Sequence, residues 1–407
     1  MRQAKSGVRH VARTHRNPVV PLRRDQRPAV VAQLRPPAAR RVDPGTLAED
    51  IREAWQRCRE AVESGDKHVL RRLHVEAKRW DKEVRYQDLL ADLKKYRSYF
   101  PNVVKICPER IDPVLIPVRS DSLESRLFRV VRGYWSMPYS KGYGRRLRFL
   151  VMDQHHGAVM GVIGLQSPSA DLNCRDKYLD VPKSRKLAVV NNTLDAFTVG
   201  ATPAYAPLLA GKLVAGFLHS PIIGQEYWRA YGNKRTTQLK KRIPQPLLAI
   251  TTASALGRSS IYNRLRFHDR LLAEPLGYTR GFGTVHLESL YPRMVDWLKA
   301  TGRYVPAGFG NGPKVRWQNI INTLTHLRLP QSYLEHGIFR EVFIFKLVHN
   351  LLEVCQSNAI PDAISFDDGQ WADFWKERWC LPRATRDKAW FEFDSHARFV
   401  EALTPHC

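Results

Sequence analysis

The sequence predicts a mixed α+β protein in which one sheet of mixed strand direction is flanked by an N-terminal helical part and a mostly helical C-terminal part. Three observations support this fold class. Apolar residues make up 43% of the 407 residues, which is enough for a full core. Apolar spacing is helical before residue 100, and it alternates over 147–165. After residue 289 the spacing is helical again, so strands are expected mainly in the middle of the chain.

The chain is expected to divide into four regions, 1–44, 45–118, 119–290 and 291–407. The first carries eleven Lys or Arg against Asp25 and Asp43, and it is interrupted by Pro18, Pro21, Pro28, Pro36 and Pro37. Such a segment buries too little apolar surface to order itself, so we expect a disordered basic arm. It either lies along phosphates or is a loose tail.

The region 45–118 is predicted to be a helical subdomain. Thr46 and Glu49 form a capping box before a run of apolar residues at helical spacing that ends at Gly65. Asp66 is placed to cap a second helix, and 89–96 has the spacing of a third.

The region 119–290 is predicted to hold the sheet. Residues 147–152 and 158–165 form a hairpin around a turn at 155–157, where His155 and His156 are interpreted as solvated turn residues rather than a catalytic or metal site. Further strands are expected at 187–191, 194–199, 247–252 and 279–287, with an apolar helix at 205–219.

The region 291–407 is expected to be mostly helical, including the apolar run 342–352. The aromatic residues near its end are interpreted as core packing rather than base-stacking platforms, because the neighbouring acids Asp367, Asp368 and Glu377 would repel phosphate.

The formal charge of +26 points to a polyanionic partner, DNA or RNA. No stretch of 18 apolar residues exists, so a membrane is not expected as partner. The six cysteines contain no C-x-x-C pair, which favours reduced thiols in a cytoplasmic protein and gives no zinc site. The acids Asp171, Asp176, Asp180 and Asp195 have no spacing that makes them converge on a metal, so they are interpreted as surface acids and no metal is predicted.

Phosphate-loop, nucleophile-elbow and zinc-protease motifs are absent from the sequence. ATP-driven work and the commonest hydrolase mechanisms therefore have no support.

Several short segments in one order resemble the DruA family of the Druantia anti-phage system. They lie at residues 142–146, 165–168, 175–179, 189–192, 208–210, 228–232, 247–248, 257–264 and 276–283. The chain departs from the usual family residues at Thr193-Leu194 and at Leu265-Arg266, as a divergent branch would. The resemblance implies a bacterial antiviral defence protein that acts with other proteins of its system.

The same region is similar to the GNAT acyltransferase architecture, and more distantly to the Mom base-modifying enzyme of phage Mu. That resemblance implies two parallel strands that splay apart, with a helix N-terminus that takes the coenzyme pyrophosphate. Here residues 201–207 replace the expected glycine-rich loop, and Pro203 and Pro207 lack amide donors. No cofactor is therefore predicted.

Candidate functional residues fall into two groups. Basic and amide side chains within the matched segments are predicted to contact nucleic acid: Lys141, Arg145, Arg146, Arg148, Arg175, Asn191, Asn192, Arg258 and Arg280. For the asparagines, turn capping is the favoured alternative. The candidate catalytic residues are Tyr262 as proton donor, like the terminal tyrosine of many GNAT-type enzymes, Arg264 as anion clamp and His286 on the following strand. For Tyr262, packing in the core is the favoured alternative.

The function expected from these observations is anti-phage defence through nucleic-acid binding, with DNA as the first candidate. A GNAT-type or Mom-like transferase that modifies a nucleobase, tRNA or protein is the main alternative. A mobile-element DNA-handling protein would suit the same charge. Whether the protein is an enzyme is left open.

Overall fold

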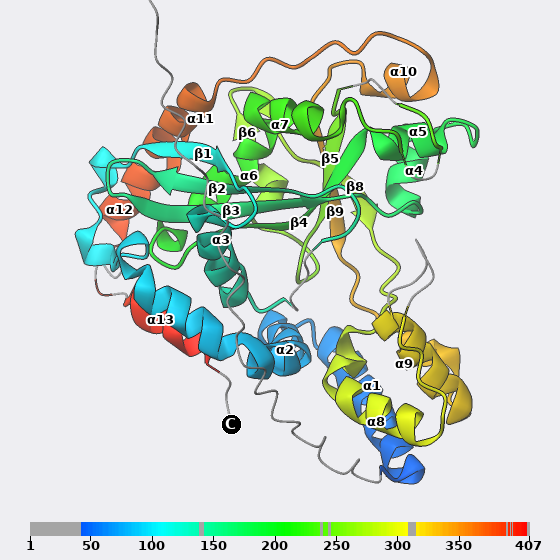
Figure 1. Cartoon of the computed structure of the whole chain (residues 1–407). Coiled ribbons are helices and arrows are strands. Elements are labelled where there is room, and N and C mark those ends of the chain that lie inside the picture. Colours follow the sequence, from blue (N-terminus) through cyan, green and yellow to red (C-terminus); the bar gives the residue numbers. More distant parts are fainter. Residues whose placement is uncertain are drawn as a thin grey trace, which may run out of the picture. The chain divides into compact units, whose positions relative to one another are not determined.

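A single seven-stranded sheet organises the residues that the computed structural model describes (Figure 1). These are residues 42–137, 142–236, 239–242, 246–307, 315–387, 390, 392 and 394–404, with 79–85 described by their backbone alone. All of them belong to one unit of continuous contacts, Arg41–Cys407. The expected arm lies outside the described residues except for its end, where Pro44 begins a helix.

The strands follow the order β1-β2-β3-β4-β5-β9-β8 across the sheet. Neighbours are antiparallel except β4 and β5, which are parallel. The strands are β1 (Pro113–Pro117), β2 (Leu147–Asp153), β3 (Ala158–Gln166), β4 (Thr193–Ala201), β5 (Ala249–Ala253), β8 (Glu274–Tyr278) and β9 (Glu341–Lys346); β6 (Arg266–Phe267) and β7 (Arg270–Leu271) form a separate two-stranded sheet. The predicted mixed α+β class is confirmed.

Helices cover both faces of the sheet (Figure 1). One face packs against α2 (Lys67–Lys95), α3 (Leu123–Tyr134) and α13 (Ser395–Leu403). The other packs against α6 (Ala210–Gly216), α7 (Pro221–Tyr231) and α11 (Asp368–Trp375). The shorter helices are α4 (Asn173–Leu179), α5 (Lys186–Asn191), α10 (Leu351–Gln356) and α12 (Leu381–Arg386).

The first helix packs against helices that follow it by more than 200 residues. The apolar face of α1 (Pro44–Glu63) forms one core with α8 (Tyr291–Ala300) and α9 (Val315–His326), including Leu47, Ile51 and Trp297. The predicted Thr46 cap is replaced by Asp43, whose carboxylate accepts from the Thr46 amide at 2.8 Å. Asp66 caps α2 as predicted, accepting from the His68 amide.

Most predicted strands are present, and there are two exceptions among those in the middle of the chain. The predicted hairpin is present as β2 and β3, and the strands predicted at 194–199 and 247–252 are present as β4 and β5. Residues 187–191 instead form α5, and the strand predicted at 279–287 is wrong because β8 ends at Tyr278 and Gly281 turns the chain with φ +66°. A brief apolar run has no period that separates a buried strand from a buried helix.

The apolar run in the C-terminal part was also assigned to the wrong structure. Residues 342–346 lie in β9, between β5 and β8, rather than in a helix. A strand with neighbours on both sides and helices on both faces is apolar throughout, which removes the alternation that marks strands. The predicted helix at 205–219 begins later, at Ala210, after Pro203 and Pro207.

The C-terminal tryptophans are core residues, as predicted. Trp371 and Trp375 are fully buried, and Trp390 is nearly so. Each indole N–H donates to a backbone carbonyl, of Leu213, Leu209 and Ala204 respectively, at 2.9–3.3 Å. Buried tryptophans need such partners for their one polar group.

Packing around Trp371 predicts a steep penalty for a single added methyl group. A Cβ on Gly216 would lie 2.1 Å from the Trp371 ring. Gly216→Ala should therefore lower the free energy of unfolding by about 1–3 kcal/mol, because the buried ring cannot move away. Gly224→Ala, on α7 with open space around the added atom, should raise it by up to about 1 kcal/mol. Urea unfolding measures both; equal stability of the Gly216 variant and the wild type would contradict this packing.

Candidate nucleic-acid interface

The parallel strands β4 and β5 diverge soon after they pair. Only three residue pairs join them, from Thr193↔Ala249 to Asp195↔Thr251. A bulge follows in β4, because Gly164 of β3 pairs with Thr198 and Leu165 pairs with Ala196. Bulges bend a strand away from its neighbour. The Thr252 hydroxyl closes the base of the gap by donating to the Ala196 carbonyl at 2.9 Å.

A cavity of about 900 Å³ opens where the two strands separate. Its floor is formed by β4 from Ala196 to Ala201 and by the end of β5. Segments on both faces of the sheet contribute walls, from α2 and α3 on one face and α6 on the other. The cavity is therefore lined from both faces of the sheet where β4 and β5 separate, and its volume is in the range of small-molecule sites.

The described lining of this cavity is strongly cationic. Glu401 is the one acid among the described lining residues, against seven basic side chains: Lys67, Arg71, Lys78, Arg132, Lys212, Arg258 and Arg398. Several of these are bonded within the protein; Lys78 donates to the carbonyls of Gly133 and Trp135. Arg71 and Arg258 are exposed, and no described acid pairs with either guanidinium. A concave, positive surface of this kind attracts anions.

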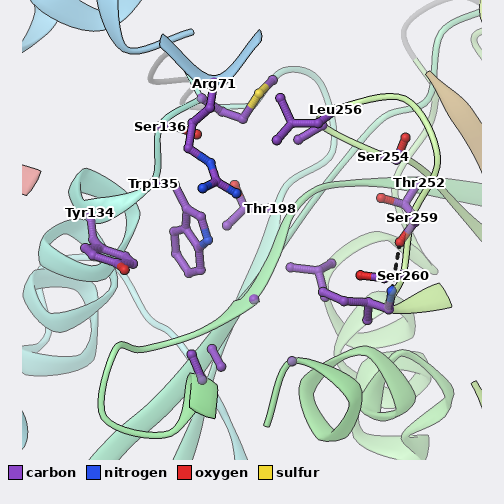
Figure 2. Close-up of a pocket in the computed structure, with 18 of the residues that line it drawn as sticks. Arg71, Tyr134, Trp135, Ser136, Thr198, Thr252, Ser254, Leu256, Ser259 and Ser260 are labelled. Atoms are coloured by element: carbon purple, nitrogen blue, oxygen red, sulfur yellow. Dashed lines mark hydrogen bonds between the residues drawn. The ribbon is translucent and has the colours of Figure 1, made fainter. Parts of the chain in front are cut away.

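One wall of the cavity combines a cation with an aromatic ring. Figure 2 shows the Arg71 guanidinium pointing into the cavity beside Trp135 and Thr198. Trp135 lies directly over β4 at Gly200, where a Cβ would be 2.5 Å from the indole ring. Gly200 thus provides the space that the ring occupies. Lys78 fixes the backbone that carries the ring.

The opposite wall carries hydroxyl groups. Thr252, Ser254, Ser259 and Ser260 lie across the cavity from Arg71 (Figure 2). The Ser259 hydroxyl accepts from the amides of Ile261 and Tyr262, each at 3.2 Å, and holds the turn. Cationic, aromatic and hydroxyl groups around one cavity can together bind the phosphate, base and sugar of a nucleotide.

Of the predicted catalytic residues, the structure places Tyr262 at the cavity. Its ring is nearly buried and packs on Phe343 and Phe345 with centroids 5.1 and 5.9 Å away. Burial raises the pKa of the phenol to about 12, while a hydrogen bond with the Thr252 side chain opposes that shift. The phenol is therefore protonated at neutral pH, and its raised pKa makes it a weaker acid than an exposed tyrosine.

His286 lies apart from Tyr262, whereas Arg264 ends the short 3-10 turn that Tyr262 begins. Arg264 is exposed and does not line the cavity. Burial lowers the pKa of Lys212 in the cavity wall, and the nearby charge of Arg264 lowers it further. His286 is buried beside His336, with Nε2 bonded to the Tyr333 carbonyl at 2.8 Å. The structure does not bring the three together, and their catalytic roles stay predictions.

The predicted nucleic-acid contacts differ in how free their side chains are. Arg145 bonds to the carbonyls of 190, 191 and 193 and to the Tyr227 hydroxyl, and Arg175 is buried against Asp176 and the carbonyls of 169 and 170. Both guanidiniums are thus occupied by hydrogen bonds within the protein. Arg146, Arg258 and Arg280 are exposed, Arg148 stacks on Phe128, and Lys141 lies outside the described residues. Nucleic-acid contact by these residues stays a prediction.

The paired asparagines lie at the end of a helix. Asn191 Nδ2 donates to the Leu187 carbonyl one turn back, and Asn192 is the C-cap residue of α5. These local bonds agree with turn or helix capping, which was the favoured alternative to nucleic-acid contact for the two asparagines.

Two polar groups interpreted as solvent-facing are enclosed instead. Asp195 lies between Gln166 and Thr251, and burial raises the pKa of its carboxyl group. His156 bonds to buried Asp153 at 2.6 Å and accepts from the Cys107 amide, which ties the hairpin turn to the segment before β1. Among the described residues, no group of three His, Cys, Asp or Glu could hold a metal ion.

The loop that would hold a coenzyme pyrophosphate does not fit that group. Between β4 and α6, the amides of Tyr205, Ala206, Leu208 and Leu209 all donate to carbonyls of the same loop. Pro203 and Pro207 have no amide hydrogen. Donors that a phosphate would need are therefore already used or missing.

The most prominent side chains of the cavity were not among the predicted residues. Arg71 belongs to a helix face where acids and bases alternate, and Trp135 follows α3 outside any motif. Arg71 and Trp135 line the cavity because the fold brings α2 and the end of α3 next to β4, and the sequence does not show that proximity.

Fold and site together define a mixed α+β protein whose sheet opens, between two parallel strands, onto a cationic cavity. Comparison with known proteins identifies the family. The model of the family described as Druantia protein DruA matches residues 64–357. A curated relative, Druantia protein DruA of Escherichia coli (strain UMEA 4076-1), is 35% identical over 301 residues, covering 72% of this chain and 74% of its own.

The chain therefore belongs to the DruA family, and the predicted resemblance is confirmed. With it the chain is assigned to Druantia antiviral defence. The matched residues include most of the cavity walls, from Lys67 to Tyr262. No solved structure matches the chain. In the described part, no helix combines the length and apolar character needed to cross a membrane.

Proposed function

We propose that this protein serves antiviral defence by binding nucleic acid, with DNA as the first candidate, at the cavity between β4 and β5. The observation that carries the proposal is the described lining, in which seven cations accompany one acid, Glu401, which already pairs with Arg398, and in which Arg71 and Arg258 are exposed. Side chains that neutralise phosphates release condensed counterions, which supplies most of the affinity of such proteins for nucleic acid. The formal charge of +26 on the whole chain also favours a polyanionic partner. The protein would bind nucleic acid in the bacterial cytoplasm, together with other proteins of the defence system.

Equilibrium binding of a labelled DNA oligonucleotide to the purified chain, measured over a series of salt concentrations, tests this function. Affinity should fall linearly with salt on a double-logarithmic plot, by about 0.9 in slope for each phosphate contacted on duplex DNA. An affinity that is independent of salt would exclude binding through these charges.

A transferase with a GNAT-like core is the second candidate, and the sheet topology supports it. The strand order has one parallel pair, β4 and β5, and that pair diverges, as the resemblance implies. Tyr262 lines the opening with a protonated phenol. Because the loop after β4 does not fit a coenzyme pyrophosphate, the candidate concerns the acceptor side only, where a base or tRNA would lie among the cations.

Replacing the Tyr262 hydroxyl separates binding from catalysis. If the phenol donates a proton, Tyr262→Phe should lower the amount of any modified nucleoside by about 100-fold or more. Mass spectrometry of DNA and tRNA from cells that express each form, with and without phage, measures the adduct. The variant keeps the ring packing on Phe343 and Phe345, so its fold is preserved. Identical spectra without any adduct in either strain would leave the binding protein as the better account.

A further inference from the structure

The cavity continues into an exposed strip of aromatic and basic side chains. Three chain segments lie side by side beyond the ends of β5, β9 and β8. The Glu341 amide donates to the Gly257 carbonyl at 3.1 Å, and the Thr279 amide donates to the Arg340 carbonyl at 2.9 Å. Gly337 bonds to Gly281 in the same way at 2.9 Å. The segments around 257, 339 and 280 therefore form one continuous surface.

This strip begins at the cavity. Arg258 lines the cavity, and its carbonyl accepts from Lys67, a second lining residue, at 3.1 Å. Neighbouring strands are spaced by about 4.8 Å, so the strip reaches about 10 Å from Arg258 to the far segment. We define it by Arg258, Phe339, Tyr278, Arg280 and Phe282.

The aromatic side chains of the strip are unusually exposed. Phe339, Tyr278 and Phe282 have exposed fractions of 55%, 53% and 52%, although most large apolar side chains of the described core are buried. Phe282 is also in ring contact with Trp317, at 5.6 Å between centroids. Exposed rings that alternate with arginines are typical of surfaces on which unpaired bases stack.

Three acids lie near the strip, and one of them, Glu335, is exposed and pairs through its backbone with Phe282. Glu341 accepts from the Ser259 amide and from Asn263, and Glu288 pairs with Arg316 at 2.8 Å. Arg316 neutralises Glu288, and the two exposed arginines of the strip, Arg258 and Arg280, outnumber the exposed Glu335, so the strip keeps the positive sign that phosphates need. Its chemistry complements a polyanion with free ring faces.

We propose that the cavity and the strip together bind single-stranded nucleic acid, with one unpaired base in the cavity against Trp135 and the flanking nucleotides on the strip. This rests on the proposed function and names its substrate class. A duplex keeps its bases stacked inside, so it offers no free base face to Phe339 or Tyr278, whereas a single strand does. A cavity of about 900 Å³ admits a nucleotide-sized ligand, and Arg71 lies beside the ring that would hold the base.

The test compares a labelled 15-nucleotide single strand, as DNA and as RNA, with the duplex of the same sequence. The variant Phe339→Ala/Tyr278→Ala removes two stacking rings, and Trp228→Ala, an equally exposed ring on α7, is the matched control. Single-strand affinity should fall at least about fivefold for each ring lost. Duplex affinity should be unchanged, and the control should bind like the wild type.

A second measurement reports on the cavity. A 2-aminopurine base in the strand should be quenched on binding, because stacking on an indole quenches its emission. Quenching should weaken in Trp135→Phe, which keeps a stacking ring but no indole, and be lost in Trp135→Leu, while circular dichroism verifies that both variants fold. Equal affinity of the wild type for duplex and single strand, with no effect of the ring variants, would overturn this inference and leave nucleic-acid binding intact. Binding to neither form would overturn both.

Discussion

DNA binding is expected to weaken by about 25- to 60-fold at about 0.1 M salt when Arg71 and Arg258 are both replaced by glutamine. Each phosphate contact contributes about 0.7–0.9 to the salt slope, which corresponds to about a five- to eightfold change in affinity at 0.1 M relative to 1 M salt. Both guanidiniums line the cavity and are exposed, and no described acid neutralises them. The slope itself should fall by about 1.4–1.8.

The control for this variant removes equal charge elsewhere. Arg110 and Lys183 are exposed and do not line the cavity, so Arg110→Gln/Lys183→Gln leaves the site intact. Fluorescence anisotropy at several salt concentrations compares the two double variants. Equal weakening in both would show that net charge, rather than the cavity, governs binding.

A loss of stability between pH 6.5 and pH 4 is the second large effect that we expect. Three buried histidines, His74, His286 and His336, lie where α2 meets the segment before β9. Burial lowers the pKa of His74 to about 3, of His336 to about 3 and of His286 to about 4, and the charge of Arg340 adds to the first two shifts. Both ring nitrogens of His74 lack a hydrogen-bond partner among the described residues.

The sign follows from where the proton binds. The unfolded chain takes up protons at histidine near pH 6.5, and the folded chain resists until the lowered pKa is reached. These histidines therefore leave stability intact above pH 6.5, and they reduce it progressively as the pH falls below that value. At pH 5 each contributes a loss of about 2 kcal/mol, which is large against a typical total of about 5–15 kcal/mol.

Urea unfolding at pH 7 and pH 5 measures this loss. His74→Leu should remove about 2 kcal/mol of the difference between the two pH values, because it deletes one proton-binding group. His155→Gln, an exposed turn residue, should leave the difference unchanged. A stability that does not change between pH 7 and pH 5 in the wild type would contradict the buried, neutral state of the cluster.

The parts of the fold that the sequence predicted are those with a local signature. The β2–β3 hairpin shows alternating spacing and a turn at Gly157, whose φ of +61° suits glycine. β9 has no such signature, because its central residues, 342–345, are buried and all apolar. The packing of α1 on α8 and α9 could not be predicted either, because an amphipathic pattern shows which face of a helix is buried but not which helix covers it.

The candidate site was predictable only in its general chemistry. Net charge indicated an anionic partner, and Tyr262 and Arg258 were identified within motifs that resemble the family. The cavity itself results from the divergence of β4 and β5, which brings together α2, the end of α3 and the loop after β5. Arg145 shows the converse, because it belongs to a basic cluster in the sequence but its guanidinium is bonded to carbonyl groups at the end of α5 and the start of β4.

Hydrogen exchange of the protein with and without a bound oligonucleotide tests most directly whether nucleic acid binds at the cavity. The account predicts slower amide exchange in residues 254–261 and 135–137, which line the opening in loops. Residues 221–231 of α7, which do not line the cavity, should be unaffected. Protection confined to residues 142–148, at the basic start of β2, would contradict the account and move the interface to that edge of the sheet.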